Sequence, residues 1–209
     1  MRKLNFLDNL IQVHRYSGNL LVKDESVSDH VWSMISLALE YVPYLNLSVK
    51  STEDSDNYIF KLEDIIFGIS VHDLDEALTG DVPRNFKYHN KYILDAVKVT
   101  SDQILLDYVG RDLYDKIKKS IDKSSPNGLL IKIFDVAQAG YKMLSEIQLG
   151  NRYFINELEN VFECMNGLKN QVNDLNCIPS AKFKLLWMIN EFIIDFEVTV
   201  KNNHVNLNK

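Results

Sequence analysis

The residues most able to do chemistry are His72, Asp73 and Glu76, at the end of an apolar segment, with Asp81 in a Thr-Gly-Asp turn just beyond. Helix positions four apart share a face, so Glu76 can reach whatever His72 binds. Adjacent helical residues such as His72 and Asp73 point about 100° apart, which still allows both to reach one ion. Imidazole and carboxylate together suit divalent ions such as Mn, Fe, Co, Ni and Zn.

A His-Asp pair alone does not make a metal site, because it more often marks the end of a surface helix. Two further ligand candidates are His30, on an apolar helical stripe, and Asp135, which follows the apolar run 129–134. An aspartate in such a run is costly to bury as an ion unless a cation meets it. The structural alternatives are a core histidine at position 30, a solvated helix-end acid at Glu76 and a helix cap at Asp81.

The elements that must position these residues are almost all helices, because apolar residues recur three and four apart and prolines are few. The clearest amphipathic helix spans 26–42. A polar loop over 46–57 precedes a helix that begins near 62, and the next break is at 79–83.

Further helices are predicted over 85–99 and 102–120, before a turn at 124–128. A long apolar helix over 129–149 ends at Gly150-Asn151, another runs to about 169, and the last spans 181–200. No linker or repeat divides the chain. We therefore expect one domain over 1–200 and a frayed tail over 201–209.

Composition narrows the function classes. The 209 residues are 46% hydrophobic and carry a formal net charge of -6, with basic residues scattered, which argues against binding of a nucleic-acid duplex. Cys164 and Cys177 lie outside any Cys-x-x-Cys or Cys/His cluster, so neither a disulfide framework nor a zinc finger is expected. No signal peptide or membrane span is evident. We expect a cytoplasmic protein of a bacterium or of a phage-infected bacterial cell.

Five sequence segments together resemble a known family. They are HRY at 14–16, ESVSDH at 25–30, HDLDEALTGDVP at 72–83, FD at 134–135 and GN at 150–151. In order and spacing the chain resembles the HD-domain phosphohydrolases over about residues 10–165, and among them the bacterial 5′-deoxynucleotidases. Segment 72–83 is the most specific, because the wider superfamily shares only its His-Asp pair.

The resemblance implies an all-α fold, an HD-domain helical bundle with a metal site between core helices. It implies one divalent ion, namely Mn, Co, Zn, Fe or Ni, held by His30, His72, Asp73 and Asp135. It also implies that the chain forms a homodimer.

The resemblance also implies roles around the ion. Glu76 matches the carboxylate that orients or deprotonates the attacking water, and Asp81 matches an acid that contacts the nucleotide or aids proton transfer. Arg15 matches a basic residue near the phosphate and sugar, and Tyr16 stands where relatives carry a tryptophan that presses on the sugar. Lys87 is a further candidate phosphate contact.

The function expected from these matches is hydrolysis of (deoxy)nucleoside 5′-monophosphates to nucleoside and phosphate. Two alternatives stay open: an HD-type deoxynucleoside triphosphate hydrolase, and a non-catalytic HD domain that senses nucleotides or binds a partner. The second alternative predicts a missing ligand or acid, and none is missing. Asp29, Asp75 and Arg84 depart from the family pattern and add charge beside the site.

Overall fold

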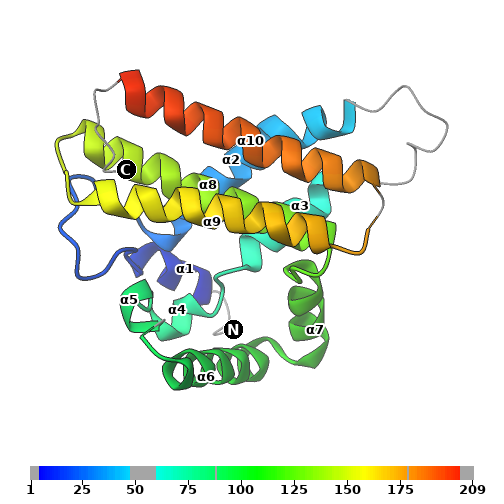
Figure 1. Cartoon of the computed structure of the whole chain (residues 1–209). Coiled ribbons are helices and arrows are strands. Elements are labelled where there is room, and N and C mark those ends of the chain that lie inside the picture. The colour runs from blue at the N-terminus through cyan, green and yellow to red at the C-terminus, as the bar shows by residue number, and fades with distance from the viewer. Residues whose placement is uncertain (1–4, 48–59, 88, 178, 203–209) are drawn as a thin grey trace. The chain divides into compact units, whose positions relative to one another are not determined.

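The computed structural model describes residues 5–47, 60–87, 89–177 and 179–202. Its helices are α1 (Asn5–Gln12), α2 (Val27–Leu47), α3 (Leu62–Val71), α4 (Glu76–Thr79), α5 (Arg84–Lys87), α6 (Lys91–Val109), α7 (Arg111–Ser120), α8 (Pro126–Gln148), α9 (Phe154–Asp174) and α10 (Pro179–Asn202). The all-α prediction is confirmed (Figure 1). The predicted loop over 46–57 and tail over 201–209 lie mostly outside the described residues.

The described residues form two compact units. The first lies within 1–33 and 70–119, and the second within 34–69 and 120–209. Helix α2 contributes its first turns to the first unit and the rest to the second. The expectation of one domain over 1–200 stays a prediction.

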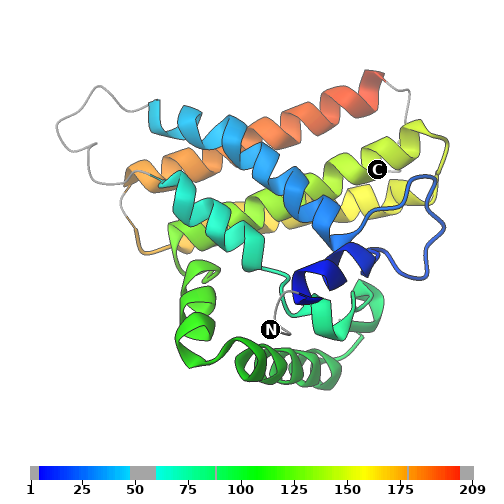
Figure 2. The same ribbon diagram turned by 180° about the vertical axis from the view of Figure 1, so that it is seen from behind.

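In the second unit α8, α9 and α10 run side by side, each antiparallel to the next, as Figures 1 and 2 both show. Their shared core includes a cluster of aromatic rings. Phe192 and Phe196 of α10 stack with ring centroids 6.4 Å apart, and Tyr141 meets Phe196 edge to face with ring centroids 5.1 Å apart. Gly140 permits this approach, because a Cβ there would lie 2.6 Å from the Phe196 ring. The apolar segments of α8 and α10 supply these rings, and burial of the rings stabilises the packing of the helices.

Helix α8 begins three residues before the predicted position 129. Ser125 caps it, because its hydroxyl accepts the Gly128 N–H at 3.1 Å, and Pro126 occupies the first turn, where no N–H partner is needed. Gly128 packs directly on the preceding turn, since a Cβ there would lie 2.1 Å from the Asp122 carbonyl oxygen. Residues 126–128, predicted as part of a turn, therefore start the helix, while 124–125 precede it.

In the first unit α1 packs on α4, and α6 packs on both α4 and α5. The predicted division into helices 85–99 and 102–120 was wrong. Helix α6 continues to Val109 and ends at Gly110, whose φ of 81° is a conformation that favours glycine. Asn90 caps its start, accepting the Ile93 N–H at 2.9 Å. Lys118 of α7 binds Asp102 of α6 at 2.8 Å, which ties the two helices together after the break.

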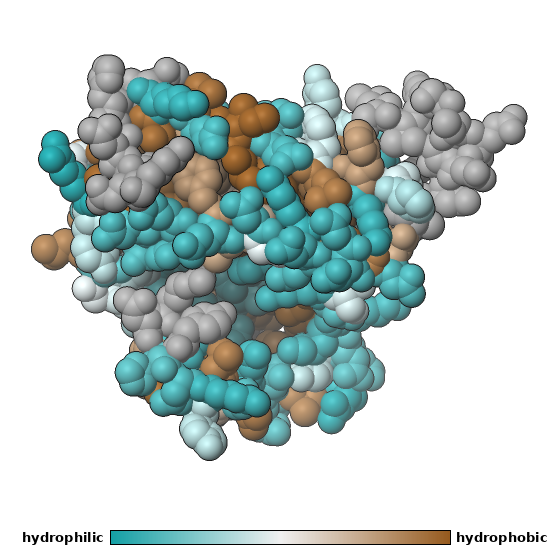
Figure 3. Space-filling view, viewed as in Figure 1, coloured by the Kyte–Doolittle hydropathy of each residue, from teal (hydrophilic) through white to brown (hydrophobic). Residues whose placement is uncertain are grey.

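On the face drawn in Figure 3, hydrophobic side chains interrupt a largely hydrophilic surface over α10. The exposed apolar residues of this helix include Phe183, Ile194 and Val198. Within the described part of the chain, no helix combines the length and hydropathy needed to cross a bilayer.

Candidate metal centre and active site

His30 is positioned by the capped start of α2. Ser26 and Asp29 form a reciprocal cap: the Ser26 N–H donates to Asp29 Oδ2 at 2.9 Å, and the Asp29 N–H donates to Ser26 Oγ at 3.1 Å. The Ser26 N–H and the Ser26 hydroxyl, which donates to the same oxygen at 2.7 Å, hold the pKa of the Asp29 carboxyl below its usual value. Asp29 and Ser26 thus fix the start of α2 at Val27, three residues before His30. The His30 side chain is fully buried.

His72 and Asp73 follow the last residue of α3, and Glu76 begins α4 after a tight turn. The Glu76 N–H closes the turn by donating to the Asp73 carbonyl at 3.1 Å, and the Gly80 N–H caps the end of α4 by donating to the Glu76 carbonyl at 2.8 Å. Gly80 has a φ of 74°, so α4 ends after a single turn. The sequence therefore presents both candidate ligands and the candidate catalytic acid from one short segment.

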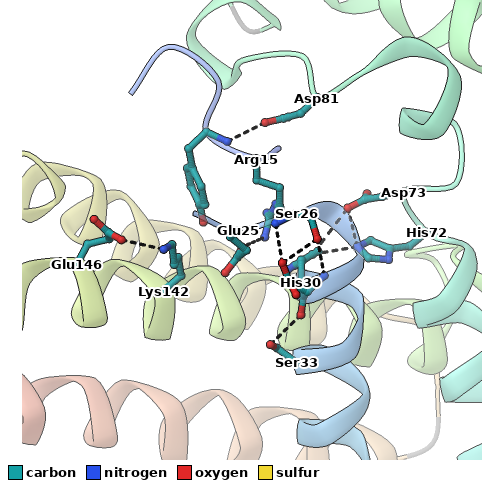
Figure 4. A network of polar contacts seen from close by, with 12 residues as sticks. Arg15, Glu25, Ser26, His30, Ser33, His72, Asp73, Asp81, Lys142 and Glu146 are labelled. Carbon is teal, nitrogen blue, oxygen red and sulfur yellow. Dashed lines mark hydrogen bonds and ion pairs between the residues drawn. The ribbon is translucent and has the colours of Figure 1, made fainter. Parts of the chain in front are cut away.

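The ligand atoms of His30, His72 and Asp73 converge (Figure 4). The two Nε2 atoms are 3.3 Å apart, and Asp73 Oδ2 lies 2.9 Å from His72 Nε2 and 3.7 Å from His30 Nε2. A tetrahedral ion with bonds of about 2.0–2.1 Å would separate its ligands by about 3.3–3.4 Å. The three observed separations bracket this value. Two imidazoles and one carboxylate at this spacing fit a divalent ion of the zinc or manganese type.

Glu76 lies in a setting that favours its neutral form. Burial, the largest cause, together with the negative charges of Asp73 and Asp81, raises the pKa of its carboxyl to about 9, while Arg15 opposes the shift. A carboxylate with a raised pKa is a stronger base than an ordinary one, which suits proton abstraction from water. A cation bound nearby would stabilise the ionised form.

The raised pKa of Glu76 gives a pH prediction for chelator-treated protein. The Glu76 carboxyl binds its proton more tightly in the folded state than in the unfolded state, so the proton stabilises the fold. This contribution to the free energy of unfolding is fully present below pH 4.5 and is lost as the pH rises through about 9. Glu76→Gln removes the loss. We expect the melting temperature of the variant to gain several degrees on wild type between pH 5 and pH 9. If the melting temperatures of wild type and Glu76→Gln differed by the same amount at every pH in that range, the raised pKa of Glu76 would be contradicted.

Asp81 contacts the Arg15-Tyr16 segment. Its Oδ2 accepts the Tyr16 N–H at 2.9 Å, and its carbonyl accepts the Ser17 hydroxyl at 3.4 Å. The Arg15 guanidinium binds Glu25 Oε1 at 3.0 Å and stands 5.2 Å from the centre of the Tyr16 ring. Two predicted substrate-binding residues and one predicted catalytic acid therefore belong to one network in the first unit.

Two further residues of the first unit bear on the site. Lys87 ends α5 and is half-buried, and its positive charge partly offsets the rise in the pKa of Asp75. Asp75, inside the His-Asp turn, bonds the Ser101 side chain of α6, while burial raises the pKa of its carboxyl. This acid anchors the turn to α6. The side chain of Arg84 lies outside the described residues.

Asp135 lies on α8, in the second unit, where its carboxylate pairs with Lys132 one turn earlier. The structure brings together His30, His72 and Asp73, and Asp135 as fourth ligand stays a prediction.

Sequence reasoning assigned no role to Glu25. Its side chain is 8% exposed, and it meets Arg15 through both its carboxylate and its backbone carbonyl. Two features of the sequence could have indicated its role: Glu25 stands beside the predicted start of a helix, and it follows Arg15, a predicted substrate-binding residue, by ten positions.

Comparisons with known proteins place the chain in a family. The family model of YfbR-like 5′-deoxynucleotidases matches residues 3–177. A 5′-deoxynucleotidase of Enterobacter sp. (strain 638) is 31% identical over 155 residues, which cover 71% of this chain and 74% of that protein. The 5′-deoxynucleotidase YfbR of Escherichia coli O1:K1 is 30% identical over the same shares.

Solved structures share the fold at low sequence identity. An HD-domain phosphohydrolase of Listeria innocua has a TM-score of 0.65 and 18% identity, over 92% of this chain and 97% of that one. The cyanophage S-2L HD phosphohydrolase DatZ, bound to dA and one catalytic Zn²⁺ ion, has a TM-score of 0.63 and 15% identity, over 97% and 98%. The chain has the HD-domain phosphohydrolase fold and belongs to the YfbR-like 5′-deoxynucleotidase family.

Proposed function

We propose that this chain hydrolyses deoxynucleoside 5′-monophosphates to nucleoside and inorganic phosphate with one divalent metal ion. The observation that carries the proposal is the convergence of His30, His72 and Asp73, with Glu76 three residues after the last of them. The family match over residues 3–177 supports the substrate class.

The ligands proposed for the ion are His30, His72, Asp73 and Asp135. Such an ion supplies positive charge that neutralises a phosphate dianion and lowers the pKa of a bound water. DatZ, which shares the fold, is described with one catalytic Zn²⁺ ion and dA, which supports both a metal and a nucleoside at sites of this kind.

The remaining chemistry is assigned to the chain's own residues. Glu76 takes a proton from the attacking water as the water oxygen bonds to phosphorus and the bond to the 5′-oxygen breaks. The protonated Glu76 or solvent water then gives a proton to the departing 5′-oxygen, which leaves as the hydroxyl of the nucleoside. Arg15, and Lys87 from α5, offset the charge of the phosphate. Asp81 contacts the nucleotide or aids proton transfer through the carboxylate oxygen that Tyr16 does not use. Positioning and charge carry most of the rate enhancement, as in other phosphoryl transfers.

The proposal is tested by supplying purified protein with Mn²⁺ or Co²⁺ and screening nucleoside mono-, di- and triphosphates with product identification. We expect nucleoside and inorganic phosphate from deoxynucleoside monophosphates. Release of triphosphate from deoxynucleoside triphosphates would instead establish the triphosphate hydrolase, and the absence of any hydrolysis would favour a sensing or partner-binding module.

A further inference from the structure

Tyr16 has an unusual backbone conformation. Among the described residues it is the one non-glycine residue with a positive φ, at 59°. For a bulky side chain this left-handed region is an outlier, and such a conformation persists only where the surrounding contacts enforce it. The strain falls on the residue proposed to face the sugar.

Asp81 supplies one of the enforcing contacts. Its Oδ2 accepts the Tyr16 N–H at 2.9 Å, across 65 residues of sequence. The next residue repeats the link, because the Ser17 hydroxyl donates to the Asp81 carbonyl. The Tyr16 carbonyl in turn accepts the Asn19 N–H at 3.0 Å, which closes a tight turn through Gly18. Both the N–H and the carbonyl of Tyr16 are therefore hydrogen-bonded.

Glu25 supplies the contacts on the other side of the segment. The Arg15 N–H donates to the Glu25 carbonyl at 2.9 Å, and the Arg15 guanidinium meets the Glu25 carboxylate at 3.0 Å. The adjoining residues His14 and Ser26 form an antiparallel bridge. Both side chains of the ion pair are largely buried, at 15% and 8% exposed, so the pair is screened less than a surface pair. Figure 4 shows the Arg15 segment with Glu25 and Asp81 as its partners.

We infer that Glu25 and Asp81 are positioning residues that hold Arg15 and Tyr16 in the one conformation that discriminates the sugar; this inference rests on the proposed function. We call the four residues the clasp. Asp81 fixes the strained Tyr16 peptide and thereby the ring that excludes a 2′-hydroxyl. Glu25 fixes the guanidinium that meets the phosphate. Asp81 thus controls selectivity between deoxyribose and ribose, whereas Glu25 controls the affinity for both nucleotides alike.

The functional test compares kcat/KM on matched deoxy- and ribonucleoside monophosphates. An apolar wall rejects an added hydroxyl by about a hundredfold, and the ring of Tyr16, which is smaller than that of tryptophan, should discriminate less. Tyr16→Trp should raise the ratio, and Tyr16→Ala should bring it close to one. Asp81→Ala should bring it to the Tyr16→Ala value, with no further fall in the double variant. Asp81→Asn, which keeps an oxygen that can accept the Tyr16 N–H, should retain most of the ratio.

The Glu25 arm separates the two positioning roles. Glu25→Ala should raise KM for both sugars by about tenfold at an unchanged ratio, and Glu25→Gln should recover most of the loss because its amide oxygen can still accept from Arg15. The exposed neighbour Asp24 provides the matched control, and Asp24→Asn should leave both quantities unchanged.

Hydrogen exchange of the segment 13–19 tests the clasp without reference to activity. Asp81→Ala should accelerate exchange of the Tyr16 amide about tenfold, the factor that corresponds to one hydrogen bond, and Asp81→Asn should not. If wild type hydrolyses no monophosphate, the proposed function fails while the exchange result still decides whether Asp81 holds Tyr16. If wild type is active, an Asp81→Ala ratio equal to that of wild type would overturn the inference, whether kcat falls or KM rises for both sugars alike. Asp81 would then act only in proton transfer or through its own contact with the nucleotide.

Discussion

Glu76→Gln is expected to lower kcat by about two to four orders of magnitude while leaving bound metal and nucleotide affinity nearly intact. The size is that of a general base removed from its reaction. The structure supports this role through the position of Glu76, three residues beyond Asp73, and through the burial that raises its pKa. Glutamine keeps the shape of the side chain but cannot take a proton from water at neutral pH.

The measurement combines steady-state kinetics with metal content and nucleotide binding for each variant. Asp135→Ala provides the contrast, because loss of a ligand should lower metal content and activity together. Glu63→Gln, an exposed residue on α3, controls for replacement of an acid elsewhere on the chain. Near wild-type turnover in Glu76→Gln would show that another group activates the water.

Glu146→Ala should cost about 3–5 kcal/mol of unfolding free energy, because it removes the carboxylate that meets a buried ammonium group. Lys142 and Glu146, one turn apart on α8, lie 2.8 Å apart with side chains 5% and 0% exposed. Asn151 donates to the second carboxylate oxygen at 3.0 Å, so the truncation also removes the acceptor of that bond. Urea unfolding monitored by circular dichroism measures the change.

Two comparisons show whether burial of the charge causes the loss. Lys142→Met with Glu146→Leu replaces both charges by apolar groups of similar volume and should restore most of the stability. Asp115→Ala removes an ion pair of the same i, i+4 spacing that is exposed, so it should change the free energy of unfolding by less than about 0.5 kcal/mol. A Glu146→Ala loss below about 1 kcal/mol would contradict the account.

The helices that could be predicted from sequence are those with a long, regular apolar stripe. The predicted helix over 26–42 corresponds to α2, and that over 129–149 corresponds to α8. The break at Gly110 was missed because apolar residues continue on both sides of it, so periodicity alone carries no interruption there. Helix α1 was missed because eight residues show too few turns for a period to be counted.

The site was predicted in part, for a different reason. His30 and His72 are 42 residues apart in sequence, and no helical period joins them; resemblance to a family supplied the link that the structure then showed as a 3.3 Å approach. The Tyr16 conformation and its bond to Asp81 could not be predicted, because the two bonded residues are 65 positions apart in sequence and no local pattern indicates a positive φ at a tyrosine. The Lys142–Glu146 spacing was visible in the sequence, but its burial depends on tertiary packing.

The most direct test of the metal-dependent nucleotidase is phosphate release from a deoxynucleoside monophosphate by chelator-stripped protein titrated with Mn²⁺ or Co²⁺. Borderline divalent ions suit the imidazole and carboxylate ligands of His30, His72 and Asp73. We expect no release in excess EDTA and recovery of activity that saturates near one ion per chain, with nucleoside and inorganic phosphate as the products. Full activity in excess EDTA after exhaustive stripping would contradict the account.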